Sequence, residues 1–204
     1  MIDRPPLKHL IEAALLAAGG PLTLDSLAAI FADDPQPPKQ EELTATLAAL
    51  MDDYRERGIE LAQVAGGFRI QVRQSCAPWV ARLWDEKPPR YSRALLETLA
   101  LMAYRQPITR GEIEEIRGVA VSTNIVKTLM EREWIRVIGH RDVPGRPALY
   151  ATTRKFLDYF GLKSLNELPP LAELRDPKFL GDDLPLEPPE TMAKAASAGT
   201  EASG

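Results

Sequence analysis

The sequence predicts a mainly helical α+β protein: tandem winged-helix domains with small β-hairpins and a disordered C-terminal tail. Three observations lead to this prediction. Apolar residues recur at helical spacing in several separate segments, a pair of alternating segments follows each group of helices, and the pattern repeats at an offset of 86 residues.

The first repeat opens with three predicted helices. Residues 7–18 carry an apolar stripe that stops at the glycines and proline of 19–21, and Thr23 is placed to cap a second helix. A third stripe runs over residues 41–57, with Gly58 at the position expected for a C-terminal cap.

A β-hairpin is expected after these helices. Residues 59–61 and 68–72 alternate between apolar and polar, and Gly66 and Gly67 between them suit a two-residue turn with positive φ at both positions. Three helices and a hairpin follow the order of a winged helix, a variant of the helix-turn-helix.

The second repeat has the same order. Thr109 and Glu112 have the spacing of a capping box, which predicts a helix start. Ser122 is placed to cap the next helix, for which three residues are predicted to face inward: Val126, Leu129 and Met130.

A second wing is expected from the strands predicted over 134–139 and 148–152. Between them, residues 143–146 read Val-Pro-Gly-Arg, which is typical of a type II turn. Thr153 then caps a last helix, which Gly161 and Leu162 end as a Schellman motif.

These elements divide the chain into three parts with net charges of −5, +6 and −5, taken over 1–86, 87–166 and 167–204. We expect a first winged-helix module with a linker helix over 1–86, a second module over 87–168, and a disordered tail over 169–204 rich in proline, alanine and acidic residues. The linker helix carries an apolar face that either docks a partner or covers its own module: Trp79, Val80, Leu83 and Trp84.

Composition excludes several classes of protein. The chain is 45% hydrophobic and 26% charged, and it has no apolar stretch long enough for a membrane helix. Cys76 is the only cysteine and the two histidines are distant, so neither a disulfide nor a zinc site is expected and a cytoplasmic location is favoured. No catalytic motif, metal site or cofactor site is found. The simplest interpretation of Cys76 is an inert thiol, and that of His140 is a surface residue of the wing. The paired aspartates at 33–34 and 52–53 are most simply solvated surface charges.

The predicted charges argue against base-specific DNA binding. The third helix of the first module is acidic on its outward face, and its counterpart in the second module lacks clustered Arg, Asn and Gln. Basic residues in the second wing, among them Arg136 and Arg146, support only weak, salt-sensitive contact with DNA. A winged-helix transcription regulator remains the alternative function, because the fold alone would allow it.

Two runs of residues resemble the bacterial segregation and condensation protein B family. The first is Leu96–Ala100 with Ala103–Arg110 and Glu112–Val119, and the second is Pro144–Pro147 with Tyr150, Thr152, Thr153, Phe156, Leu157 and Phe160–Leu162. The resemblance covers about residues 7–171.

This resemblance implies a non-enzymatic subunit of a condensin-like complex that acts in chromosome condensation and segregation at the nucleoid. It implies a homodimer formed by the first module, and a second module that binds the kleisin, segregation and condensation protein A, and through it the SMC ATPase. For that surface we expect contributions from Tyr104, Arg117, Arg146 and Phe160. A core position is the simpler role for Phe160, and a solvated surface charge is the equal alternative for Arg117 and Arg146.

Overall fold

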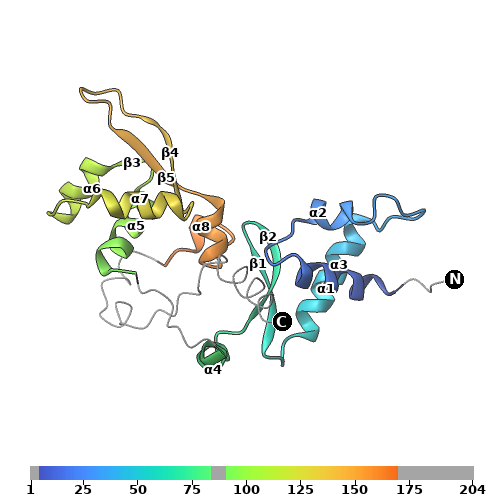
Figure 1. Cartoon of the computed structure of the whole chain (residues 1–204). Coiled ribbons are helices and arrows are strands. Elements are labelled where there is room, and N and C mark those ends of the chain that lie inside the picture. Colours follow the sequence, from blue (N-terminus) through green and yellow to red (C-terminus); the bar gives the residue numbers. More distant parts are fainter. Residues whose placement is uncertain (1–4, 84–90, 170–204) are drawn as a thin grey trace, which may run out of the picture.

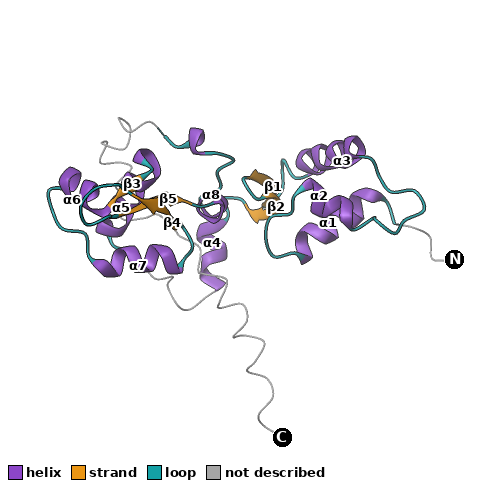
Figure 2. Cartoon of the chain, turned by 90° about the horizontal axis from the view of Figure 1, so that it is seen from above, coloured by secondary structure: helices purple, strands orange, loops and turns teal. Residues whose placement is uncertain are grey.

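A computed structural model describes residues 5–83 and 91–169, which form two groups of helices, each with a β-hairpin (Figures 1 and 2). The mixed helical and antiparallel architecture confirms the predicted fold class. The tail predicted beyond residue 169 and Trp84 of the predicted linker helix lie outside the described residues.

The first group contains α1 (Leu7–Ala17), α2 (Leu24–Ala29), α3 (Gln40–Asp53), β1 (Ile59–Val64) and β2 (Gly67–Val72). The predicted cap of α2 is confirmed, because the Thr23 hydroxyl oxygen accepts a hydrogen bond from the Ser26 amide at 3.0 Å.

The predicted end of α3 is wrong by one turn. The helix ends at Asp53 and Tyr54 is its C-cap, so Gly58 has no capping role. The chain leaves the helix through tight turns, in which the Arg57 amide donates to the Tyr54 carbonyl at 3.1 Å, and Gly58 lacks the positive φ of a left-handed cap. The Tyr54 ring is buried and its hydroxyl donates a hydrogen bond to Glu12 of α1. Burial, reinforced by this carboxylate, raises the pKa of Tyr54 to about 12.

The first hairpin forms, but its turn lies one residue earlier than predicted. Val64 pairs with Gly67, so Ala65 and Gly66 make the two-residue loop and only Gly67 has a positive φ, +121°. A Cβ on Gly67 would lie 2.1 Å from the carbonyl oxygen of Leu22. That close approach comes from a short bridge in which Leu22 and Phe68 exchange two backbone hydrogen bonds, at 2.8 and 2.9 Å.

The linker helix, expected over residues 75–86, begins two residues later than predicted and is described as far as Leu83. It consists of α4 (Ala77–Val80) and the 3₁₀ turn η1 (Ala81–Leu83). Trp79 is 64% exposed and Leu83 is 77% exposed, so these two side chains do not cover the module that precedes them.

The second group begins with α5 (Arg93–Arg105), β3 (Ile108–Thr109), α6 (Arg110–Arg117) and α7 (Thr123–Glu131). It continues with β4 (Ile135–His140), β5 (Ala148–Thr152), α8 (Arg154–Tyr159) and the 3₁₀ turn η2 (Leu165–Glu167). The helices α1 and α5 begin at Leu7 and Arg93, and the helices α2 and α6 begin at Leu24 and Arg110. In both pairs the second helix begins 86 residues after the first, which is the predicted repeat offset.

The capping predictions for the second group are confirmed. Thr109 and Glu112 form the reciprocal capping box of α6, and the hydroxyls of Ser122 and Thr153 accept hydrogen bonds from amides in the first turns of α7 and α8. Gly161 has φ +70°, and the Leu162 amide donates to the Leu157 carbonyl at 2.8 Å, which completes the Schellman motif after α8.

The second wing belongs to a three-stranded antiparallel sheet in the order β3-β5-β4. β3 was not predicted from the sequence, since it has only two residues. Ile108 of β3 pairs with Tyr150 of β5, in the place that the Leu22–Phe68 bridge holds in the first repeat. β4 contains a bulge at Ile138, because the register passes from Val137 directly to Gly139.

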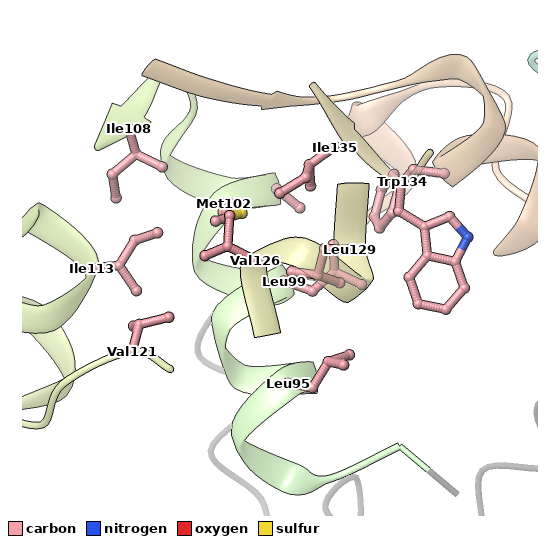
Figure 3. Packing of buried hydrophobic residues seen from close by; sticks show 12 residues of the cluster. Leu95, Leu99, Met102, Ile108, Ile113, Val121, Val126, Leu129, Trp134 and Ile135 are labelled. Atoms are coloured by element: carbon pink, nitrogen blue, oxygen red, sulfur yellow. The ribbon is translucent and has the colours of Figure 1, made fainter. Parts of the chain in front are cut away.

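Each group has its own hydrophobic core. The first is built from buried residues of α1, α2, α3 and β1: Ile11, Leu15, Leu27, Phe31, Leu43, Leu47, Leu50, Tyr54 and Leu61. The second surrounds α5 (Figure 3) and includes Leu95, Leu99, Met102, Ile108, Ile113, Val121, Val126, Leu129, Trp134 and Ile135. Val126 and Leu129 are buried as predicted, whereas Met130 is 42% exposed and the prediction that it faces inward is wrong. Met130 instead lines the open groove described below, because it lies one residue beyond Leu129 and is therefore rotated about 100° around the helix axis from it.

Candidate partner-binding surface

Arg117, one of the four predicted surface residues, is largely enclosed within the second module. Its side chain is only 10% exposed, and Nη2 lies 3.2 Å from Glu97 Oε2 on α5. Hydrogen bonds from Arg93, and secondly from Arg117, lower the pKa of Glu97. Arg117 Nε is buried without a hydrogen-bond partner in the described part of the chain. The side chain therefore ties α6 to α5, and it is not a solvated surface charge.

Phe160 and Tyr104 also take part in packing. The Phe160 ring is half-buried, with its centroid 4.9 Å from that of Phe156 and 5.4 Å from that of Trp134. The Tyr104 hydroxyl donates a hydrogen bond to the carbonyl oxygen of Pro169. Phe160 thus extends the core, and Tyr104 holds the last described residue of the chain against α5.

Arg146 is the exposed member of the four. It follows Gly145, whose φ of +85° is that of the third position of a type II turn, and the Arg146 amide donates to the Val143 carbonyl at 2.9 Å. This confirms the predicted turn. Within residues 5–83 and 91–169, no carboxylate forms an ion pair with Arg146.

Arg146 is one of several exposed residues of the second wing that together combine positive charge with apolar side chains. We call this set the wing patch: Arg136, Val137, Ile138, Val143 and Arg146. The exposed fractions of the three apolar members lie between 39% and 47%. The bulge leaves Ile138 without a partner in β5, and β4 is the edge strand of the sheet. Such a surface suits contact with another polypeptide.

An ion pair joins the loop end of the wing to α6. Arg141 Nη2 lies 2.8 Å from Glu112 Oε1, and the same carboxylate accepts hydrogen bonds from the amide and hydroxyl of Thr109. The pKa of Glu112 is lowered, chiefly by the Thr109 amide. One carboxylate therefore caps the helix and orients the wing at the same time.

A second carboxylate fixes the segment between α6 and α7. Glu114 accepts hydrogen bonds from the Val121 amide at 2.8 Å and from Arg110 at 2.9 Å, and these bonds lower its pKa, the former more strongly. Sequence reasoning missed this contact, because a glutamate and an amide seven residues apart across a helix end have no recognisable spacing.

A shallow groove opens between α6, α7 and β5. Its volume is about 330 Å³, and it is lined by Arg110, Thr123, Val126, Lys127, Met130, Glu131 and Tyr150. Both lysine and arginine at its rim already have carboxylate partners, at 2.9 Å for Arg110 with Glu114 and 3.6 Å for Lys127 with Glu131. The groove thus offers apolar contact, and the charges of Arg110 and Lys127 at its rim are already neutralised by ion pairs.

The described residues contain no group of three or more His, Cys, Asp or Glu side chains that could hold a metal ion. Across the same part of the chain, no helix is both long enough and apolar enough to cross a membrane. Cys76, the residue that precedes α4, is a half-buried free thiol.

A comparison with protein families gives one match over most of the chain. The model described as "Segregation and condensation complex subunit ScpB" matches residues 9–171. The chain belongs to the ScpB family. Membership confirms the resemblance seen in the sequence, and it identifies the chain as a member of a family of segregation and condensation complex subunits.

ScpB relatives cover nearly the full chain. The segregation and condensation protein B homolog of Coxiella burnetii is 54% identical to this chain, and the alignment covers 96% of this chain and 93% of the homolog. Segregation and condensation protein B of Syntrophotalea carbinolica is 45% identical, over 86% of this chain and 87% of its own.

Solved ScpB structures are also similar to this chain. Mycobacterium tuberculosis ScpB is 37% identical, with a TM-score of 0.35 over 79% of this chain and 99% of that one. A dimer of an ScpB N-terminal domain complexed with an ScpA peptide is 31% identical, with a TM-score of 0.36 over 41% of this chain and 98% of that one.

Proposed function

We propose that this chain is a non-enzymatic, dimeric subunit of a condensin-like complex, which binds the kleisin ScpA and through it the SMC ATPase. In this role it acts in chromosome condensation and segregation at the nucleoid. Support comes from the family match, which spans both helical groups, and from an exposed surface suited to contact with another polypeptide. The functional units that we propose are 1–86 for dimerisation, 87–168 for kleisin binding and 169–204 as a tail.

The wing patch is the observation that carries the kleisin proposal. Of the residues predicted for this surface, Arg146 is exposed and has apolar neighbours on the same wing, whereas Tyr104, Arg117 and Phe160 support the module that presents it. An acidic segment with apolar side chains would complement this patch in charge and in apolar contact.

For the dimer, α1 and the end of α2 in the first module each present an uncovered apolar side chain. Leu16 of α1 is 72% exposed, and Ile30 at the end of α2 is 52% exposed. The dimer and the ScpA peptide in the solved structure are properties of that relative. Because of its family membership we extend both to the first module of this chain, which would dimerise and also contribute to ScpA binding beside the second module.

Binding to full-length cognate ScpA, measured by calorimetry, tests the kleisin proposal. We expect Arg146→Glu to weaken binding at least tenfold, because the reversed charge repels an acidic segment. Lys155→Glu is the matched control: it makes the same change in charge at an exposed α8 residue outside both the wing patch and the groove. If the wild-type chain fails to bind ScpA at micromolar concentrations, the proposed function is wrong. Equal losses in the two variants would remove the wing patch from the interface.

The exposed arginines of the wing also support weak contact with DNA. Such contact would not depend on base sequence and would disappear as salt is added. A gel-shift comparison of one duplex with random duplexes separates this role from that of a transcription regulator, which would prefer a particular sequence at physiological salt.

A further inference from the structure

The turn of the first hairpin lies against the end of α8, on the second module (Figures 1 and 2). The Ala65 amide donates to the Leu162 carbonyl at 2.9 Å, and the Ala65 carbonyl accepts from Arg154 Nε at 2.8 Å. The next amide, that of Gly66, donates to Asp158 Oδ1. Two successive residues of the turn thus have their backbone groups satisfied by the other module.

Gly66 is suited to this contact for a reason unrelated to the hairpin itself. Its φ lies outside the left-handed region, so an alanine would not strain the turn. A Cβ at this position would, however, lie 2.6 and 2.8 Å from the two carboxylate oxygens of Asp158. The absence of a side chain at residue 66 therefore allows the carboxylate to reach the amide.

The α8 side of the contact is equally well defined. Asp158 and Arg154 are one helical turn apart on α8, and Leu162 belongs to the Schellman motif that ends it. Gly161, at φ +70°, directs the chain so that the Leu162 carbonyl meets the Ala65 amide. A helix face and a helix end thus form a single polar receptor for the turn.

This contact is polar, whereas each module is held together by its own apolar core. No residue belongs to both buried clusters in the described part of the chain. Hydrogen bonds to half-buried backbone groups are exchanged for bonds to water when the two surfaces part, so separation costs little compared with unfolding either core.

We propose that the turn at residues 65–66 and its receptor on α8 form a reversible latch, which fixes the orientation of the two winged-helix modules. Closed, the latch holds them in the arrangement of Figure 1; open, it leaves them joined only through the chain that follows β2. The latch goes beyond the proposed function, because it concerns the geometry between the modules and not the identity of a partner.

Distances between two spin labels on the full chain, measured by double electron–electron resonance, test the latch. Cys76 is the only native cysteine, so in a Cys76→Ser background labels can be attached to Ala48→Cys on α3 and Asn124→Cys on α7, both at exposed positions. Dilution with excess unlabelled protein restricts the signal to distances within one chain, even in a dimer.

We expect one narrow distance population with the latch intact. Gly66→Ala and Asp158→Ala should each replace it with a broad distribution, and the double variant should match the single ones, since both remove the same interaction. Gly20→Ala is the control. It also adds a methyl group to a first-module glycine without positive φ, but into open space, so the narrow population should persist.

Three results would overturn the latch: a broad distribution with the native residues, an unchanged narrow population in both variants, or a change in only one of them. Circular dichroism of each variant verifies that the modules stay folded. If Gly66→Ala unfolds the chain, Asp158→Ala and Arg154→Ala decide the question alone, because they alter only exposed or half-buried side chains of α8.

Discussion

Arg117 has the sequence position of an exposed charged residue, but in the structure its side chain is largely enclosed. The spacing of α6 places it at the last turn of an amphipathic helix, where arginine is common and is usually solvated. The Glu97 carboxylate on α5, twenty residues earlier, draws it inward. No local pattern links these two residues, so the pair could not be predicted from the sequence.

Removing the Arg117 side chain should destabilise the second module. We expect Arg117→Ala to lower the free energy of unfolding by about 1 to 3 kcal/mol, because it leaves Glu97 without its enclosed partner. Arg93→Ala removes the other, 74% exposed partner of Glu97 and should cost about 0.5 kcal/mol or less. Urea denaturation of both variants measures the difference. Equal losses would show that enclosure of Arg117 contributes nothing.

Gly145 tests the turn that presents Arg146. No heavy atom lies within 4 Å of a Cβ built at this position, so the effect of a substitution comes only from its positive φ. Gly145→Val should cost about 1 to 3 kcal/mol, since a β-branched residue strongly resists this conformation. Gly111→Ala, at a helical glycine with equally open space, should instead stabilise the module slightly. Thermal unfolding compares the two, and an unchanged melting temperature for Gly145→Val would contradict a strained turn.

At the scale of elements, helix starts were predicted well and some element ends were not. Thr23, Thr109, Ser122 and Thr153 cap helices as expected because a cap depends on residues within one turn of each other. β3 depends instead on its pairing with β5, about forty residues later. Local signals determine the first kind of boundary, and tertiary contacts determine the second.

The α6 region should lose stability in acid. The folded-state pKa values of Glu112 and Glu114 lie below the ordinary value of 4.5, chiefly because the Thr109 and Val121 amides bind the ionised carboxylates. A lowered pKa means that this stabilisation is fully present above pH 4.5 and is lost as the pH falls through the folded-state values. Urea denaturation from about pH 6 to about pH 3 should therefore show a falling midpoint.

A non-titrating variant provides the control for this pH dependence. Glu112→Gln can still accept a hydrogen bond from the Thr109 amide but does not ionise, so the decline below pH 4.5 should be shallower than in the native chain. An identical decline in both proteins would assign the acid sensitivity to other carboxylates.

On the scale of the whole molecule, the repeat made the two helical groups predictable, but not how they meet. Each group follows from periodicity and capping within about 80 residues. The contact between Gly66 and Asp158 joins residues 92 positions apart through a backbone amide and an absent side chain, for which sequence patterns have no signature. The wing patch is a similar case: its charges were predicted, whereas the exposure of Ile138 follows from a bulge that the alternation of β4 does not reveal.

Two separate cores joined by polar contacts should unfold as two units. Leu129 is fully buried in the second core, and Leu129→Ala should cost that module about 2 to 5 kcal/mol through lost contacts and the cavity left behind. Amides of α1 and α3 should keep their protection from hydrogen exchange in this variant, because their apolar contacts lie in the other cluster. Leu47→Ala, at a buried position of α3, should produce the reverse pattern. Hydrogen exchange followed by mass spectrometry resolves the two modules, and loss of protection across both in either variant would mean that they fold as one cooperative unit.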